Sequence, residues 1–168
     1  LPSGNDAGAA IAAHIAGSIS AFADMMNEEA LAIGATGTHF TNPHGLTDED
    51  HYTTAYDLYL IFNEAMKEPE FRKIEGTTSY YAEYVDSAGE TVSQTWKMSN
   101  QYLTGEQQAP DGVTVTGGKT GTTQAAGYCL IVSSEAEDGG EYISVVLKAD
   151  SRPNLYDNMT NLMNKIVN

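Results

Sequence analysis

Positive charge and cysteine are both scarce in this chain. Eight Lys and Arg residues stand against 23 Asp and Glu residues, which gives the 168-residue chain a formal net charge of -15. A surface this acidic repels phosphate backbones, so nucleic acid is not expected as a partner. The single cysteine, Cys129, cannot form a disulfide within the chain, and its apolar neighbours predict a buried small side chain.

Long hydrophobic runs are also absent. No apolar stretch approaches the roughly 20 residues that a membrane-spanning helix needs, and no signal-peptide pattern is present. The chain begins at Leu1 rather than at Met, and a recognisable motif follows almost at once. We therefore expect a processed or truncated chain, so the lack of a targeting segment does not indicate where the parent protein is located.

Hydrophobic residues make up 41% of the chain, enough for one domain with a core. Over about residues 1–76 the apolar residues recur at helical spacing. In the second of these helices we expect a buried stripe of Phe22, Met25, Met26 and Leu31. The predicted helices run from Asp6 to Ala16, from Ser18 to about Ile33, and from Thr53 or Thr54 onward, with a short continuation at Pro69.

The pattern changes to period two near Thr77, and about residues 77–168 are predicted to hold strands and a closing helix. Helices followed by antiparallel strands and a final helix indicate an α+β fold in a single domain, residues 1–168. The predicted strands are a hairpin from Thr77 to Lys97 and the segments 113–120, 127–133 and 142–147, with a loop at 104–111 and the closing helix from Pro153.

Three short segments carry candidate chemistry. Ser3-Gly4-Asn5 precedes the first helix, the loop 40–46 reads Phe-Thr-Asn-Pro-His-Gly-Leu, and Lys119-Thr120-Gly121-Thr122 ends a predicted strand. Each segment alone is a weak signal. Serine-active penicillin-recognising enzymes, however, use Ser-x-x-Lys, then Ser-x-Asn, then Lys-Thr-Gly, and the second and third elements occur here in that order.

On these residues the chain resembles the low-molecular-weight penicillin-binding proteins, which are serine-type D-Ala-D-Ala carboxypeptidases. The resemblance extends over nearly the whole chain, and the Asn-Pro-His-Gly-Leu loop distinguishes it from class A β-lactamases. It implies an incomplete penicillin-binding, transpeptidase-like fold and an extracytoplasmic parent protein, anchored to the membrane. The implied partners are peptidoglycan stem peptides ending in D-Ala-D-Ala and β-lactams, and no cofactor or metal is implied.

The resemblance also implies a role for each polar residue of these motifs. Acyl transfer needs an activated hydroxyl, a proton route to the leaving amine and donors for the oxyanion. Ser3 would relay a proton toward the leaving group, and Asn5 would hydrogen-bond the substrate backbone. Lys119 would supply positive charge for the terminal carboxylate of the substrate.

The rest of the Lys-Thr-Gly segment would bind substrate. The hydroxyls of Thr120 and Thr122 could reach the terminal carboxylate, and the backbone N–H of Thr122 is the expected oxyanion donor. Gly121 leaves the edge of the strand open, so a peptide substrate could lie against it as an added strand.

One element of the pattern has no match. In the family the nucleophile is the serine of Ser-x-x-Lys, and no serine of this chain has a lysine three positions later. Thr116 has the formal spacing to Lys119, but it lies at the Gly-rich entry to a strand. A nucleophile there would need Lys119 for a second role besides its role in the Lys-Thr-Gly motif, so we reject it. We therefore expect the chain alone to be inactive, and to need a missing N-terminal segment, self-association or rearranged packing for stability.

Two other classes of function are compatible with the same residues. The chain could be a non-catalytic module that binds peptidoglycan peptides or another protein, or it could belong to a β-lactamase. A metal site at His39, His44 and His51 is not expected, because their loop already matches a loop that needs no metal. Tyr80, Tyr81, Tyr84 and Trp96 are expected to pack within the hairpin rather than to form a sugar platform.

Overall fold

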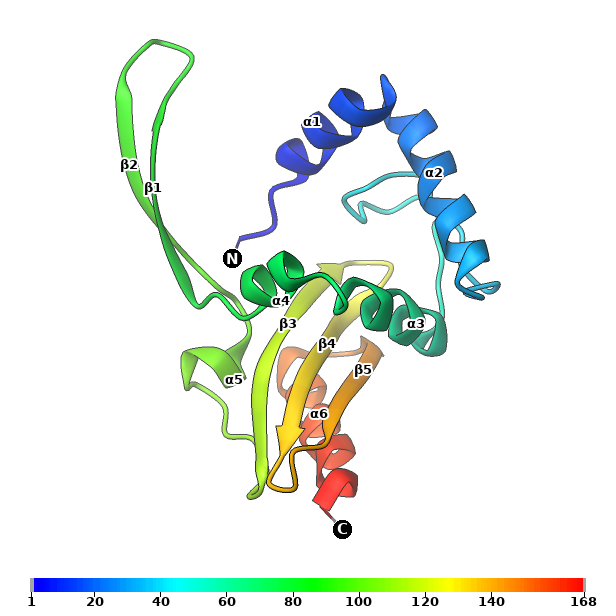
Figure 1. Cartoon of the computed structure of the whole chain (residues 1–168), viewed down its shortest axis with the longest axis vertical. Helices are drawn as coiled ribbons and strands as arrows, with labels where there is room; N and C mark the ends of the chain where they lie inside the picture. The colour runs from blue at the N-terminus through cyan, green and yellow to red at the C-terminus, as the bar shows by residue number, and fades with distance from the viewer. Residues whose placement is uncertain (1, 168) are drawn as a thin grey trace.

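The computed structural model describes residues 2–167 and has the α+β architecture that the sequence predicts (Figure 1). Four helices come first, followed by a hairpin, a short helix, a three-stranded sheet and a closing helix. The elements are α1 (Asn5–Ala16), α2 (Ile19–Ala32), α3 (Ala55–Ala65), α4 (Pro69–Glu75), β1 (Ser79–Val85), β2 (Thr91–Lys97), α5 (Gln101–Thr104), β3 (Val113–Thr123), β4 (Gly127–Ala136), β5 (Glu141–Ala149) and α6 (Arg152–Val167).

The helix boundaries follow from capping residues that the sequence displays. The hydroxyl of Ser18 accepts a hydrogen bond from the N–H of Ala21 at 3.0 Å and begins α2. The hydroxyl of Thr54 accepts one from the N–H of Asp57 at 3.0 Å and begins α3. Gly17 ends α1 with a φ of 81°, a left-handed conformation that glycine adopts without strain.

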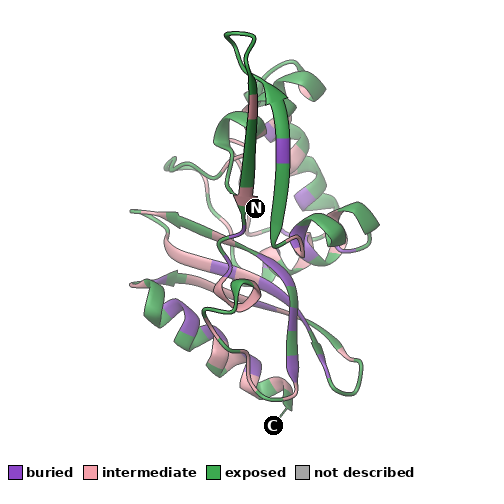
Figure 2. Ribbon diagram, turned by 90° about the vertical axis from the view of Figure 1, so that its left-hand side faces the viewer, coloured by how far each residue is buried: buried purple, intermediate pink, exposed green. Residues whose placement is uncertain are grey.

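The core lies between the sheet and the closing helix. The antiparallel sheet has the order β3-β4-β5, and α6 packs across one of its faces (Figures 1 and 2). Burying apolar area of this kind contributes roughly 25 cal/mol per Å². The buried cluster consists of Val113, Val115, Leu130, Val132, Ala149, Leu155, Tyr156, Met159 and Met163.

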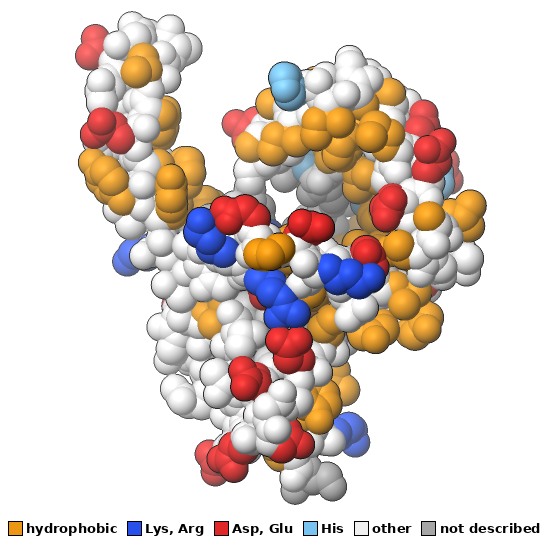
Figure 3. Space-filling model, viewed as in Figure 1, with side chains coloured by type: hydrophobic (Ala, Val, Ile, Leu, Met, Phe, Trp, Pro, Cys, Tyr) orange, Lys and Arg blue, Asp and Glu red, His pale blue; other side chains and the backbone are white. Residues whose placement is uncertain are grey.

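Helices α1 to α4 lie on the opposite face of the sheet, whereas the short α5 lies beside β3 and packs against α6 (Figure 1). Helices α3 and α4 contact β5 and β3, whereas α1 and α2 form an arch above them that makes much less contact with the sheet (Figure 1). Hydrophobic side chains run over this arch in the space-filling view, with a hollow beneath it (Figure 3). Ile15 of α1 is 56% exposed and Met25 of α2 is 48% exposed.

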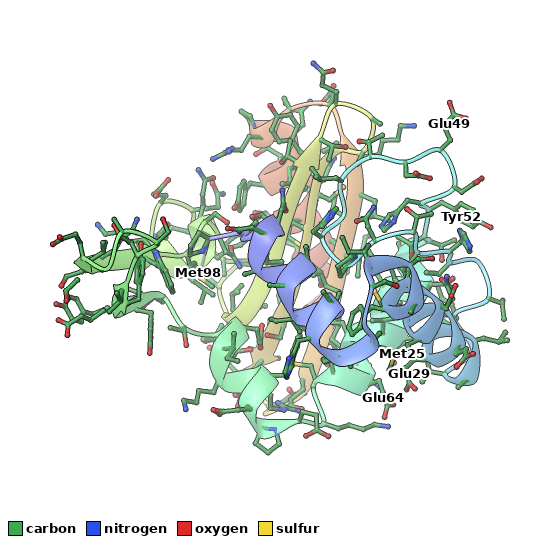
Figure 4. All side chains as sticks on the ribbon, turned by 90° about the horizontal axis from the view of Figure 1, so that it is seen from above. Met25, Glu29, Glu49, Tyr52, Glu64 and Met98 are labelled. Carbon is green, nitrogen blue, oxygen red and sulfur yellow. The ribbon has the colours of Figure 1, made fainter. Side chains whose placement is uncertain are left out.

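This exposure corrects the predicted stripe of the second helix. Phe22 and Met26 are half-buried, but Met25 and Leu31 are exposed, because the described residues leave much of their surface uncovered. Figure 4 shows Met25 and Glu29 of α2 and Glu64 of α3 gathered at one side of the molecule. Glu29 and Glu64 both line a groove between these two helices.

The hairpin β1–β2 projects away from the rest of the chain (Figures 1 and 2). Three of its aromatic side chains stack on each other, as expected: the ring centroids of Tyr80 and Trp96 are 6.2 Å apart, and those of Tyr84 and Trp96 are 6.4 Å apart. Tyr81 differs from the expectation, because it is 62% exposed and takes no part in this stack. Short cross-strand contacts of this kind stabilise a two-stranded ribbon that has little core of its own. Met98, labelled in Figure 4, is buried at the base of the hairpin.

No single helix in residues 2–167 is long and apolar enough to cross a membrane. Only α1 and α2 taken together reach that length and composition, and they are bent against each other by 83°.

Candidate active site

The two motifs that are farthest apart in sequence meet in the structure. The Nζ of Lys119, on β3, donates a hydrogen bond to the Oγ of Ser3 at 2.6 Å, across 116 positions of sequence. The same Nζ also donates to the backbone carbonyl of Thr120. Ser3 lies just ahead of α1, so the packing of the arch over the sheet brings its hydroxyl to the lysine. The predicted pair is therefore one polar cluster.

The environment of this amine changes its acidity. Lys119 is exposed along its side chain, but protein atoms replace part of the water around its Nζ. This partial desolvation lowers the pKa of Lys119, because a charged amine is less stable where its hydration is reduced. A lysine with a lowered pKa takes part in proton transfer more readily than an ordinary surface lysine.

The remaining predicted residues line the same edge of the sheet. Strand β3 pairs with β4 on one side only, so its other side carries unpaired backbone groups among the described residues. Gly121 lies opposite Cys129 in the register, and a methyl group added to it would come no closer than 4.0 Å to its neighbours. Thr122 lies opposite Tyr128, near the end of the strand. This edge has the space and the hydrogen-bonding groups for a peptide strand.

Asn5 and Thr120 are the sequence neighbours of the two residues in this cluster. Asn5 is the exposed first residue of α1, two positions after Ser3. The hydroxyl of Thr120 lies 2.6 Å from the hydroxyl of Ser99. Sequence reasoning missed Ser99, and no local pattern marks it, because its contact with Thr120 joins segments 21 positions apart. It connects the base of the hairpin to the strand that carries Lys119.

The loop 40–46 is ordered by side-chain hydrogen bonds to its backbone. The Oδ1 of Asn42 accepts hydrogen bonds from the N–H groups of His44 and Gly45 at 3.2 Å and 2.7 Å. The side chain of Asn27 bonds both the N–H and the carbonyl of Phe40, at 2.7 Å and 2.8 Å. This pairing holds the start of the loop to α2.

A cleft separates this loop from the tip of the sheet. His51 and Phe40 line one side and Thr123 and Cys129 the other. Burial lowers the pKa of His51, although nearby Asp48 partly opposes the shift. Cys129 is half-buried rather than fully buried, because the cleft opens beside it. Within residues 2–167 no three His, Cys, Asp or Glu side chains are grouped so that they could hold a metal ion.

The geometry defines a class of protein by its site, in which the serine of a Ser-x-Asn motif and the lysine of a Lys-Thr-Gly motif are hydrogen-bonded to each other. The sequence profile of the family described as D-alanyl-D-alanine carboxypeptidase matches residues 1–151. The chain belongs to that family.

Individual relatives agree with this assignment. The chain is 37% identical over 135 residues to D-alanyl-D-alanine carboxypeptidase DacF of Bacillus subtilis, covering 80% of this chain and 32% of that protein. It is 32% identical over 171 residues to a Streptomyces D-alanyl-D-alanine carboxypeptidase, covering 98% of this chain and 56% of that protein. The crystal structure of a Streptomyces DD-transpeptidase superposes with a TM-score of 0.86 at 32% identity, covering 98% of this chain and 63% of that one.

The coverage of these relatives is one-sided. Nearly all of this chain is matched, but it spans only about a third to three fifths of the length of the proteins it matches. The relatives therefore contain substantial sequence that has no counterpart here.

Proposed function

We propose that this chain is part of a serine D-alanyl-D-alanine carboxypeptidase, which removes the terminal D-Ala from peptidoglycan stem peptides through an acyl-serine intermediate. β-Lactams, as mimics of that substrate, acylate the same serine. The observation that carries the proposal is the 2.6 Å contact between Ser3 and Lys119 beside the open edge of β3. It brings the two matched motifs together next to a strand edge suited to a peptide.

In this proposal the substrate lies along β3 as an added strand. Lys119 and the hydroxyls of Thr120 and Thr122 bind its terminal carboxylate, and Asn5 hydrogen-bonds its backbone. Gly121 lets the substrate backbone approach closely, and the N–H of Thr122 donates to the oxyanion. The binding energy thus fixes the scissile carbonyl at the strand edge.

The reaction requires a nucleophilic serine from a segment outside this chain. Its hydroxyl oxygen attacks the carbonyl carbon of the penultimate D-Ala, and the tetrahedral intermediate collapses as the C–N bond breaks. Ser3, hydrogen-bonded to Lys119, relays the proton that the attacking hydroxyl gives up to the departing amine of D-alanine, so that free D-alanine leaves. Water then hydrolyses the acyl-serine and releases the shortened peptide.

The companion segment has a place to bind. The exposed side chains of Ile11, Ile15 and Met25 form an apolar surface over the arch. The relatives contain additional sequence that has no counterpart in this chain, which supports a further segment that packs on this surface. We propose that this segment covers the arch and supplies the serine, that the chain alone is inactive, and that without the segment it self-associates. The substrate class further supports an extracytoplasmic location for the parent, with a membrane anchor outside this chain.

The test is intact-mass spectrometry after incubation with a penicillin, under denaturing conditions and over a time course. The chain alone is compared with a longer product of the same gene that includes the preceding segment. We expect one stable acyl adduct on the longer protein and none on the chain alone. A longer protein that never acylates would refute the carboxypeptidase proposal, and rapid turnover of the penicillin would favour a β-lactamase. An adduct on the chain alone would refute the need for an external serine.

A further inference from the structure

A buried acid lies directly behind the strand that carries the active-site lysine. Glu75, the last residue of α4, is only 9% exposed. Its Oε1 accepts a hydrogen bond from the hydroxyl of Ser133 at 2.8 Å, and that hydroxyl in turn accepts one from the hydroxyl of Thr116 at 2.9 Å. Its Oε2 has no hydrogen-bond partner among the described residues. Neither the motifs nor the proposed reaction assigns any task to this carboxyl group.

The carboxyl group occupies the space that a side chain at position 117 would need. A Cβ built on Gly117 would lie 1.8 Å from the Oε2 of Glu75 and 2.2 Å from its Oε1. The pairing of β3 with β4 shifts register between Val115 and Gly117, so a bulge lies at this point. The next residue, Gly118, has a φ of 140°, and a Cβ there would lie 2.3 Å from the carbonyl oxygen of Ile131. The backbone therefore requires glycine at position 118, and position 117 admits only glycine while the carboxyl group of Glu75 stays in place.

These contacts fix the backbone immediately before Lys119. Glu75 closes one side of the Gly117–Gly118 segment, and β4 closes the other through Ile131. A strand that bulges at two glycines has many accessible conformations unless its surroundings select one. The direction in which Lys119 leaves the bulge therefore depends on what fills the space behind Gly117.

We propose that Glu75 is a positioning residue: by filling the space behind Gly117 and bonding Ser133, it sets the conformation of the bulge and so the placement of Lys119 and Thr120 for substrate. This inference rests on the proposed carboxypeptidase function. It assigns Glu75 no contact with substrate, since the residue acts through the strand.

Three other charged side chains line a cleft together with Glu75. They are Arg72, which lies on the same helix, Glu141 of β5, which pairs with Arg72 at 2.8 Å, and Glu135 of β4. Burial raises the pKa of Glu75, while Ser133, Arg72 and the backbone of Gly118 oppose that shift. The uncharged form therefore persists to higher pH than it does in an exposed glutamate.

The experiment uses the longer gene product and measures second-order acylation by a fluorescent penicillin, with KM and kcat for release of D-alanine from a D-Ala-D-Ala peptide. The variants are Glu75→Gln, Glu75→Ala, Gly117→Ala and the double variant Glu75→Ala with Gly117→Ala. Glu70→Ala is the matched control, because Glu70 is an exposed acid on the same helix that pairs with Lys73 at 3.0 Å.

We expect Glu75→Ala and Gly117→Ala each to slow acylation by about 10- to 100-fold, as a misplaced strand would. Glu75→Gln, which keeps the shape and the bond to Ser133, should stay within about threefold of the unchanged protein, as should Glu70→Ala. In the double variant the added methyl group fills the space that the carboxyl group vacates, so its acylation rate should exceed that of Gly117→Ala alone. Such mutual rescue is the signature of direct coupling between neighbours.

Two results would overturn the inference. One is a Glu75→Ala variant that folds and acylates like the unchanged protein, and the other is a double variant no faster than Gly117→Ala. If Glu75→Ala does not fold, the other variants still decide the question. The inference is refuted if Glu75→Gln slows acylation and the double variant is no faster than Gly117→Ala. Failure of the unchanged longer protein to acylate would count against the proposed function instead, so the two failures are distinguishable.

Discussion

The carboxylate of Asp57 accepts a hydrogen bond from the N–H of Gly37 at 2.7 Å. The same oxygen accepts a second bond, also 2.7 Å, from the hydroxyl of Thr38. Asp57 is 5% exposed at the start of α3, and Gly37 follows α2. Together these two bonds tie the end of the arch to the helix that packs on the sheet.

Replacing this carboxylate should destabilise the fold. Hydrogen bonds to charged groups contribute about 1.5–3 kcal/mol each, so we expect Asp57→Ala to lower the free energy of unfolding by about 3 kcal/mol. Urea denaturation of the longer gene product measures the change. Glu49→Ala is the control, because Glu49 is exposed on the neighbouring loop (Figure 4). Equal midpoints for the two variants would contradict the assigned anchoring role.

The lowered pKa of Lys119 has a consequence for substrate binding. As pH rises, this amine loses its proton before a free lysine with a pKa of 10.5 would, and its attraction for the terminal carboxylate is lost with it. KM for a D-Ala-D-Ala peptide should therefore rise from neutral pH toward about pH 10. Lys119→Arg should bind more weakly at neutral pH but lack this rise, since arginine stays charged. Lys97→Arg is the control for replacing a lysine elsewhere in the chain. If KM rises as much with pH in Lys119→Arg as in the unchanged protein, the titrating group is not Lys119.

The buried carboxyl group of Glu75 should make stability depend on pH. Burial raises its pKa in the folded state above the ordinary value of 4.5. Its contribution to folding is therefore fully present below that value and falls as pH rises through the raised pKa, because the folded state resists the charge. Glu75→Gln removes this dependence. The free energy of unfolding of the variant relative to the unchanged protein should increase from about pH 4 to about pH 8. Urea midpoints of the two proteins measure this change. A difference, variant minus unchanged protein, that stays constant or falls as pH rises would contradict the prediction.

Covering of the arch by a companion segment can be tested with polar substitutions at Ile15 and Met25. In the chain alone, Ile15→Gln with Met25→Gln should reduce self-association, because it removes exposed apolar surface. In the longer gene product the same pair should destabilise by about 2–4 kcal/mol, since each side chain would then be buried. Light scattering and thermal unfolding measure the two effects. His14→Gln, adjacent and exposed, is the control, and an unchanged melting temperature in the longer protein would show that the surface stays uncovered.

Much of the architecture is predictable from local sequence. Ser18 and Gly17 mark the boundary of α1 and α2, and alternating residues in 91–97 mark β2 with the bounds that the structure gives. Caps and periodicity act within a few residues, so a sequence displays them directly. The three segments with candidate chemistry are also visible in the sequence, because each is a short motif and the motifs follow a known order.

Features that depend on distant contacts were not predicted. The short helix α5 ends in a φ of 81° at Gly105 and depends on the buried Asn100 cap, which no long apolar pattern announces. Glu75 reads from sequence as one more acid at the end of a helix, and its burial is decided by Ser133 and Gly117 far along the chain. The exposure of Met25 and Leu31 was missed for the opposite reason: their spacing predicts a buried face, but not what buries it.

The contact between Ser3 and Lys119 has a kinetic meaning as well. Bringing together residues 116 positions apart closes a long loop, which costs entropy before the contact repays it. The helices can form early from local interactions, whereas the site cannot exist in any partly folded chain. Reactivity of this site in the protein that carries the nucleophile would therefore report on molecules in which the segment before α1 has docked against β3.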